Sequence, residues 1–429
     1  MAKRADQYLE MIDHHIDEDN SRVMENTIRL VAGSPGFSCF QGVPELLMEA
    51  TKHCMTSRSD LNAVLSYGNP VGYQKFLDEL AKFLTDEYGT KVSCSNLMAT
   101  GGSTWAITAI ARMFVGTSAP VFVSNPTFNG SIMILKDELH LNVIPVQMDD
   151  KGIDTGNLEE LLEDIFSSVG TDHVTDNRPY WGMVSLISNY DNPTGISLSP
   201  ERSKRLVDLG RKYNLLVVSD DIYSLLYYTG DKYLPVPRLI TYDDSSDPAY
   251  QGRVLSIGSF SKLLAPGLRV GWIEGPERVI QLLSSVPSLL GGSVCHYPSS
   301  VLASALQLGL VQDHVTRIRE IYGSRLKAVM KVLDEQLPAA FSYIAPKGGY
   351  FIWIRLLEEV NVSDLCDLCE TKFNVSLSPG HAYYLGDKAE NCVRITFGYY
   401  EEEVLVEGIK RMCGGMREYL SSLASDATS

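Results

Sequence analysis

The sequence predicts an α/β fold, in which a mostly parallel central sheet is sandwiched by helices and a smaller α+β domain follows. Between about residues 96 and 275, short apolar segments alternate with longer helical patterns. Short, nearly continuous apolar strands separated by helices are typical of a parallel sheet covered on both faces. After residue 275 the pattern changes to long helices over 299–336, followed by two strands that flank a helix. This change predicts the second domain.

The strand candidates of the first region are short apolar runs bounded by turn residues. Helices are predicted between most of them, for example at STWAITAIARMF and PERSKRLVDLGRKY. Ligands of such sheets bind beyond the carboxyl ends of the strands, so we look for chemistry in the loops that follow them. The strand candidates are PVFVSN, LNVIPVQ, YWGMVSLI, LLVVSD, RVLSIG and LRVGWIE, and in the second region GGYFIWIRL and CVRITFG.

The length of the chain indicates more than one domain. Its 429 residues exceed the roughly 250–300 residues at which a single core stops growing. We expect a large domain over 43–295 and a small C-terminal domain over 296–429. Residues 1–42 carry too little apolar surface to fold alone, so we expect them to pack on the small domain or on a partner subunit.

The charge excludes several function classes. The formal net charge is −16, from 37 basic and 53 acidic residues, and there is no basic run, which argues against nucleic acid and anionic membranes as partners. An anionic substrate would need a local arginine or lysine site. The first twenty residues lack the apolar core of a signal peptide, and no apolar run approaches the roughly 20 residues that span a bilayer. A cytoplasmic location is the expectation.

The eight cysteines are scattered and too sparse for a disulfide scaffold. Cys366 and Cys369 form a CxxC within a segment that reads as a helix. Since no second pair and no histidine lie nearby, packed thiols are a better interpretation than a zinc site, and we expect no metal.

The segment SIGSFSKLLAPGLRVGW contains the first candidate for chemistry. Lys262 follows the predicted strand RVLSIG, in a loop rich in small polar groups, where its amine could form an imine with an aldehyde cofactor. Most lone loop lysines are solvated surface charges. Ser259, Ser261 and Arg269 lie within eight residues, and their hydroxyl and guanidinium groups suit a phosphate anion.

Three further segments follow predicted strands or open a predicted helix. Asp220 and Asp221 end a predicted buried strand, and Tyr223 follows. A purely structural interpretation of this segment is a helix N-cap followed by core aromatic residues. In SNYDNPTG, Asn192 could present its amide to a site, although the segment could also be a plain turn. In ATGGST, a glycine pair precedes Ser103 and Thr104, where a helix N-terminus could bind phosphate. Nucleotide-binding fingerprints are missing from this segment.

Taken together and in this order, the motifs SFSKxxAPGLRVGW, NPTG and DDxY resemble those of the class I/II aminotransferases, which are fold type I pyridoxal-phosphate enzymes. The resemblance extends from about Gly33 to the last helix. It implies that residues 43–295 form the cofactor-binding domain and that pyridoxal 5′-phosphate is the cofactor. It also implies a homodimer with shared active sites.

The resemblance also assigns roles to residues of this chain. Lys262 would form the imine with the cofactor, and Asp220 would pair with the pyridine nitrogen, keeping the ring protonated as an electron sink. Tyr223 and Asn192 would bond the phenolic oxygen, while Asp221 receives no catalytic role. Phe128 would stack on the ring, and Tyr67 would reach the phosphate of the neighbouring subunit. The phosphate cradle would comprise Gly102, Ser103, Thr104, Ser259 and Arg269.

The substrate would be anchored by Arg394, whose guanidinium can bind an α-carboxylate through two parallel N–H bonds. Asn192 would contribute to the same site, and Gly33 would line it with its backbone. Two further positions stay open: Tyr297 could line the distal pocket from the neighbouring subunit or simply pack, and His381 could approach substrate or be structural.

The implied activity is transfer of an amino group from an L-amino acid to a 2-oxo acid by a ping-pong mechanism. The segments GGYFIWIRL and VRITFG are similar to those of the branch that uses 2-aminoadipate, aromatic or branched-chain amino acids. A C–S β-lyase or another β/γ-elimination enzyme on the same fold is the main alternative, because its early steps use the same residues. A transcriptional regulator that kept the fold is a further alternative, but no basic recognition helix precedes the match.

Overall fold

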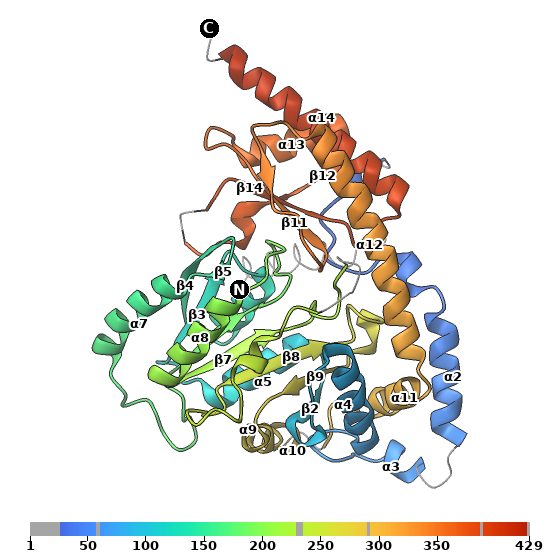
Figure 1. The fold of residues 1–429 in the computed structure, drawn as a ribbon, viewed down its shortest axis with the longest axis vertical. Helices are drawn as coiled ribbons and strands as arrows, with labels where there is room; N and C mark the ends of the chain where they lie inside the picture. The colour runs from blue at the N-terminus through green and yellow to red at the C-terminus, as the bar shows by residue number, and fades with distance from the viewer. Residues whose placement is uncertain (1–25, 57–60, 229–234, 290–291, 387–388, 427–429) are drawn as a thin grey trace.

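The computed structural model describes residues 26–56, 61–228, 235–289, 292–386 and 389–426. A large central sheet with helices around it forms one part of the molecule, and a small sheet with long helices forms the other (Figure 1).

The large sheet has eight strands, in the order β2-β9-β8-β7-β6-β3-β4-β5. Its central five strands, β8-β7-β6-β3-β4, are all parallel, whereas β9 is antiparallel to both of its neighbours and β5 is antiparallel to β4. The strands are β2 (Leu97–Thr100), β3 (Pro120–Asn125), β4 (Asn142–Asp149), β5 (Gly152–Ile153), β6 (Gly182–Leu186), β7 (Leu215–Asp220), β8 (Val254–Ser259) and β9 (Gly271–Glu274).

Both faces of this sheet are buried. Along β3, Val121 and Val123 pack into one apolar core while Phe122 between them packs into another, as the two-residue period of a strand requires. Helices α5 (Ser103–Phe114) and α9 (Glu277–Leu283) contribute to the first core, and α7 (Thr155–Val169) and α8 (Pro200–Lys212) to the second. Continuously apolar strands are therefore stable here, because neither face meets water. The remaining helices of this part are α4 (Gln74–Tyr88), α6 (Asn129–Ile132), the π-helical turn η3 (Met133–Glu138) and α10 (Ser285–Leu289).

The small part contains a four-stranded antiparallel sheet in the order β10-β11-β14-β13, covered by long helices (Figure 1). Its strands are β10 (Ser342–Tyr343), β11 (Phe351–Arg355), β13 (Ser378–Pro379) and β14 (Cys392–Thr396), and its helices are α12 (Leu310–Gln336), α13 (Val362–Phe373) and α14 (Glu402–Asp426).

The N-terminal segment joins this small part. Strand β1 (Ile28–Arg29) pairs in parallel with β12 (Val375–Ser376), and the N–H of Thr396 donates to the carbonyl of Leu30. Helices α2 (Val43–Thr56) and α3 (Leu61–Leu65) follow. Helix α11 (His296–Gln307) packs on α2 and α4, so the first helix after residue 295 lies against the large part rather than the small sheet. The predicted division into a segment over 1–42, a large domain over 43–295 and a small domain over 296–429 stays a prediction.

The predicted α/β architecture is confirmed: six strand candidates form β3, β4, β6, β7, β8 and β9, and the two helix candidates form α5 and α8. The CxxC cysteines lie on α13 as free thiols, and burial raises the pKa of each to about 12. Across the described ranges, no group of three or more acidic, cysteine or histidine side chains is arranged to hold a metal. None of the described helices has both the length and the apolar character that a bilayer crossing requires.

The start of α7 offers a test of local helix stability. The Asp154 carboxylate accepts hydrogen bonds from the N–H groups of Gly156 and Asn157, which would otherwise lack partners. We expect Asp154→Ala to lower the free energy of unfolding by about 1 kcal/mol, measured by denaturant titration. The matched variant Asp154→Asn keeps the oxygen acceptor and should lose much less; equal losses in the two variants would contradict the capping role.

Candidate active site

Most of the predicted site residues lie at one edge of the large sheet. The carboxyl ends of β2, β3, β6, β7 and β8 all point to this edge, and β9 begins there because it runs in the opposite direction. Gly102, Phe128, Asn192 and Lys262 each follow one of these strands by a few residues, Asp220 is the last residue of β7, and Arg269 lies two residues before β9. The parallel topology thus brings together residues that are up to 167 positions apart, from Gly102 to Arg269.

Lys262 lies within this group with its amine pointing toward the N-terminal segment. Its Nζ donates a hydrogen bond to the carbonyl oxygen of Gly33 at 2.5 Å. Its own carbonyl accepts a hydrogen bond of 3.0 Å from the hydroxyl of Tyr350, which fixes the loop from the small sheet. Gly33, predicted at the substrate site, therefore contacts the predicted catalytic amine directly.

The electrostatic surroundings favour the neutral form of this amine. Burial, together with the charges of Arg394 and Arg269, lowers the pKa of Lys262 to about 8, while Asp220 opposes the shift. A neutral amine is the form that attacks an aldehyde, and the lowered pKa makes this form more abundant near neutral pH than for an ordinary lysine.

Asp220 ends β7 and presents a carboxyl oxygen that nothing else uses. Its Oδ1 is buried and has no hydrogen-bond partner among the described residues. Burial raises the pKa of Asp220 to about 7, with a further contribution from the charge of Asp221, while Lys262 lowers it. A buried, unpartnered carboxyl oxygen is costly, so it fits a proton donor supplied by a bound ligand.

Arg394, on β14 of the small sheet, reaches the same site. Its Nη1 donates to Oδ1 of Asn192 at 2.9 Å, and its Nη2 donates to the carbonyl of Val31 at 2.6 Å. The side chain is buried, its Nε has no partner, and it forms no ion pair within the described part of the chain. A buried guanidinium held only by neutral acceptors is suited to receive a carboxylate.

Two aromatic rings hold the guanidinium in place. The Cζ atom of Arg394 lies 4.3 Å from the ring centre of Phe351 and 4.8 Å from that of Tyr383. Tyr383 is itself tied to the large domain, because its carbonyl accepts from the N–H of Thr127 at 2.9 Å, just beyond β3. The guanidinium of Arg394, the predicted substrate anchor, is therefore oriented by both parts of the molecule.

The predicted phosphate cradle surrounds the start of α5. Gly102 has a positive φ of 99°, and an added Cβ would lie 2.8 Å from Nη2 of Arg269. That Nη2 donates to the carbonyl of Gly101 at 3.0 Å, and Nη1 lies 3.3 Å from the hydroxyl of Ser261. No side chain caps this helix, so its first N–H groups, at Ser103 and Thr104, are available to an anion.

Ser259, Tyr223 and Phe128 complete the predicted set on this edge. The hydroxyl of Ser259 lies 3.0 Å from that of Ser261 and accepts from the Ser261 N–H. Tyr223 is buried, with its ring in edge contact with Tyr350 and Phe351, and burial raises the pKa of its hydroxyl, which stays protonated. The backbone of Phe128 precedes α6 at the end of the β3 loop.

Two tyrosines lie outside the cluster: Tyr67, which was predicted to act across subunits, and Tyr297, for which contact with a partner and simple packing were both left open. Tyr67 is 83% exposed, and its carbonyl accepts a hydrogen bond from the N–H of Ser293. Tyr297, on α11, is 42% exposed. A large aromatic side chain in water fits contact with a second subunit, and both roles remain predictions.

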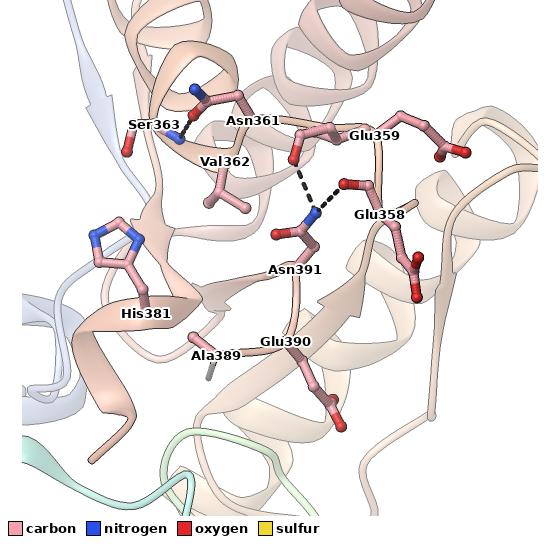
Figure 2. Close-up of a pocket in the computed structure, with 10 residues that line it drawn as sticks. Glu358, Glu359, Asn361, Val362, Ser363, His381, Ala389, Glu390 and Asn391 are labelled. Carbon is pink, nitrogen blue, oxygen red and sulfur yellow. Dashed lines mark hydrogen bonds between the residues drawn. The ribbon is translucent and has the colours of Figure 1, made fainter. Parts of the chain in front are cut away.

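A separate cavity of about 400 Å³ lies in the small domain, and His381 is among its lining residues (Figure 2). The amide of Asn391 donates to the carbonyls of Glu358 and Val360 at its border. The other lining residues are mainly acidic or small, and Lys262 and Arg394 are not among them. The observed position of His381 thus gives it no contact with the predicted chemistry.

Sequence reasoning missed the residues that support the site from the small sheet. The hydroxyl of Tyr350 donates a hydrogen bond to the carbonyl of Lys262 and lies 3.0 Å from the hydroxyl of Tyr322, and both tyrosines are buried. Phe351 lies under Arg394. Both residues belong to GGYFIWIRL, which was interpreted only as a strand and a specificity segment. The sequence signal that could have pointed to these two supporting residues was an aromatic pair directly after the glycine pair Gly348-Gly349.

These groups fit pyridoxal 5′-phosphate. The unpartnered Oδ1 of Asp220 fits a protonated ring nitrogen, the uncapped start of α5 with Arg269 fits the phosphate, and Lys262 supplies an amine of lowered pKa for the aldehyde.

Comparison with known proteins agrees with this chemistry. The family described as aminotransferase class I and II matches residues 25–411. The aromatic-amino-acid aminotransferase 1 of Thermococcus litoralis is 27% identical over 398 residues, covering 91% of this chain and 90% of that protein. The 2-aminoadipate transaminase of Thermus thermophilus is 26% identical over 413 residues, covering 93% and 96%. The crystal structure of a multiple substrate aminotransferase from Thermococcus profundus superposes with a TM-score of 0.82 at 26% identity, covering 97% and 95%.

The lowered pKa of Lys262 predicts how aldehyde capture depends on pH. We expect the rate at which the cofactor-free protein captures pyridoxal 5′-phosphate to rise with pH and to level off above about 8, because only the neutral amine attacks. Stopped-flow absorbance measures this rate. Lys262→Ala is the control and should show no covalent capture at any pH; a rate that falls with rising pH would contradict the assignment.

The positive φ of Gly102 predicts a defect confined to phosphate binding. Gly102→Ala should weaken pyridoxal 5′-phosphate about tenfold, because a left-handed backbone costs an alanine roughly 1–2 kcal/mol and its Cβ presses on Arg269. Binding of pyridoxal, which lacks the phosphate, should change little. Gly267→Ala is the matched control, since its Cβ would meet no heavy atom within 4 Å. Equal weakening of both ligands by Gly102→Ala would argue for general misfolding instead.

Proposed function

Because this chain belongs to the class I and II aminotransferases, we propose that it moves the amino group of an L-amino acid with an aromatic side chain to a 2-oxo acid. We also propose that 2-aminoadipate and branched-chain amino acids are weaker donors, that the reaction is ping-pong, and that the enzyme is a homodimer.

The observation that carries this proposal is the state of Arg394. It is buried beside Asn192, it has no carboxylate partner within the described residues, and it shares its environment with Lys262, whose pKa it lowers. A substrate α-carboxylate would supply the missing anion and would replace the carbonyl of Val31 as the acceptor of Nη2. The same bond would place the substrate amine and Cα near Lys262.

The cofactor, when bound, supplies a ring that can accept the electron pair left at the substrate Cα. Asp220 would hold the proton on the ring nitrogen through its unpartnered oxygen. Lys262, as a neutral amine, would take the proton from the substrate Cα and return it to the cofactor carbon that is bonded to the transferred nitrogen. Tyr223 stays protonated, and its hydroxyl would donate a hydrogen bond to the phenolic oxygen of the cofactor.

The ping-pong order follows from the single carboxylate anchor. The amino acid and the 2-oxo acid both carry an α-carboxylate, and both would use Arg394. The first product must therefore leave before the second substrate binds.

The aromatic preference rests on the surroundings of the anchor. Phe351 and Tyr383 flank Arg394, and Trp353 lies in edge contact with Tyr383. Aromatic rings prefer such edge-to-face neighbours. The relative from Thermococcus litoralis is named for aromatic amino acids and that from Thermus thermophilus for 2-aminoadipate, which supports including both classes.

The homodimer rests on exposed apolar groups on the segment that precedes α4. Tyr67 is strongly exposed, and Met48 on α2 and Leu65 on α3 are also exposed. A symmetric partner that covers this face would bring Tyr67 to the second site.

A panel of amino donors tests the proposed substrate class. With the pyridoxal form of the enzyme, phenylalanine and tyrosine should convert the cofactor to its amine form faster than 2-aminoadipate, leucine or aspartate, as followed by absorbance. L-cysteine conjugates should give no pyruvate and thiol. Release of pyruvate and thiol faster than amino transfer would replace the proposal with a C–S β-lyase.

The role of Arg394 is tested in the same assay with a matched ligand pair. The wild-type enzyme should prefer phenylalanine over phenethylamine, which lacks the carboxylate. Arg394→Gln should reduce this preference at least about tenfold, because it removes the bidentate donor. An unchanged preference in the variant would show that the carboxylate is bound elsewhere.

A further inference from the structure

A second buried carboxylate lies directly behind the predicted site, at Asp221. Asp220 is the last residue of β7, and Asp221 follows it with its N–H still bonded to the carbonyl of Ile257 on β8, so the alternation of the strand continues and sends the two side chains to opposite faces. Asp221 is 3% exposed. The transfer chemistry described above makes no use of it.

Three serine hydroxyls, each from a different strand or the loop after it, surround the Asp221 carboxylate. Ser219, two residues earlier on β7, and Ser188, after β6, lie 2.7 and 3.0 Å from Oδ1. Ser256, which pairs with Ser219 in the register of β7 and β8, donates to Oδ2. All three serines are buried. Three hydroxyl donors around one carboxyl group favour its ionised form.

The other charged groups near Asp221 nearly balance each other. Arg238 is buried, forms an ion pair with Glu274 of β9, and lies with its Cζ 3.8 Å from the ring centre of Tyr88 of α4. The pKa of Asp221 is raised overall by burial, and Arg238 and the serine hydroxyls offset part of this rise and so favour the ionised form. With Arg238 neutralised largely by Glu274, an ionised Asp221 leaves a net negative charge behind Asp220.

We propose that Asp221 is a positioning residue that acts through Asp220: its buried negative charge strengthens the hold of Asp220 on the proton of the cofactor's ring nitrogen. The two carboxyl groups repel each other in a medium of low polarity, and a shared proton on the ligand side relieves that repulsion. The charge of Asp221 is already felt by Asp220 in the protein alone, where it raises the pKa of Asp220.

This inference rests on the assignment of Asp220 to the ring nitrogen, and the two can be tested separately. The probe is pyridoxal 5′-phosphate with an isotopically labelled ring nitrogen, whose NMR chemical shift reports directly whether that nitrogen carries a proton. The measurement is a pH titration of the holoenzyme and needs no turnover. Asp220→Asn should remove the ring proton altogether; if it does not, the Asp220 assignment fails.

With Asp220 intact, Asp221→Asn should lower the proton affinity of the ring nitrogen about tenfold, so that the proton is lost at lower pH than in the wild type. Asp221→Glu retains the charge and should restore the wild-type titration. The matched control is Asp243→Asn, which removes another buried carboxylate that precedes β8 at the opposite edge of the sheet. It should lower stability and leave the titration unchanged.

The proposal would be overturned if the ring nitrogen titrated in Asp221→Asn as it does in the wild type. It would also be overturned if Asp243→Asn shifted the titration of the ring nitrogen as much as Asp221→Asn does. If Asp221→Asn does not fold or bind cofactor, Ser256→Ala decides alone. It removes one hydroxyl donor from Asp221, favours the protonated carboxyl, and should shift the titration in the same direction by a smaller factor. An unchanged titration in Ser256→Ala would then reject the role of Asp221.

Discussion

The active site depends on one constraint: parallel strands present their carboxyl ends at the same edge of a sheet. Six strands of the large sheet end at that edge and β9 begins there. Five of the loops at this edge carry the predicted site residues. They contribute different chemical groups, among them the carboxylate of Asp220 and, from the single loop between β8 and β9, the amine of Lys262 and the guanidinium of Arg269. The sheet is stable because both faces are covered, and the loops are therefore free to carry polar groups.

The charges at this edge are arranged for a ligand rather than for one another. Asp220 has an unpartnered oxygen, Arg394 is held by neutral acceptors, and the pKa of Lys262 is lowered to about 8 by burial and by two arginines. Each of these is unfavourable in the protein alone, and under the proposed function each would be relieved by a group of the cofactor or substrate. By contrast, Arg238 already has a carboxylate partner within the protein, Glu274 of β9.

The small sheet and the segments around it contribute direct contacts to this edge. Tyr350 holds the backbone of Lys262, Phe351 and Tyr383 orient Arg394, and the N-terminal strand β1 is paired to β12 in the same domain. Through Gly33 and Val31, that N-terminal segment accepts hydrogen bonds from both Lys262 and Arg394. A movement of the small domain would therefore change the anchor and the amine together.

Much of the fold and of the site could be predicted from local sequence. The apolar strands of the large sheet and the helices α5 and α8 were recognisable from their periods, and the motifs around Lys262, Asp220 and Asn192 indicated the family before any geometry was known. The supporting residues could not be found in this way. Tyr350, Phe351 and Asp221 look like ordinary core or turn residues in the sequence, and their roles arise from partners that are 30 to 90 residues away or on other strands.

The sequence by itself determined which residue types are available for the chemistry and which strand each of them follows, because strand period and loop motifs are local properties. The tertiary structure alone decided which of these groups lie without a partner, which way the two consecutive aspartates point, and that the amine of Lys262 is buried among positive charges. The physical reason is that burial and electrostatic coupling depend on distances between segments, and those distances are set only when the sheets and the small domain pack together.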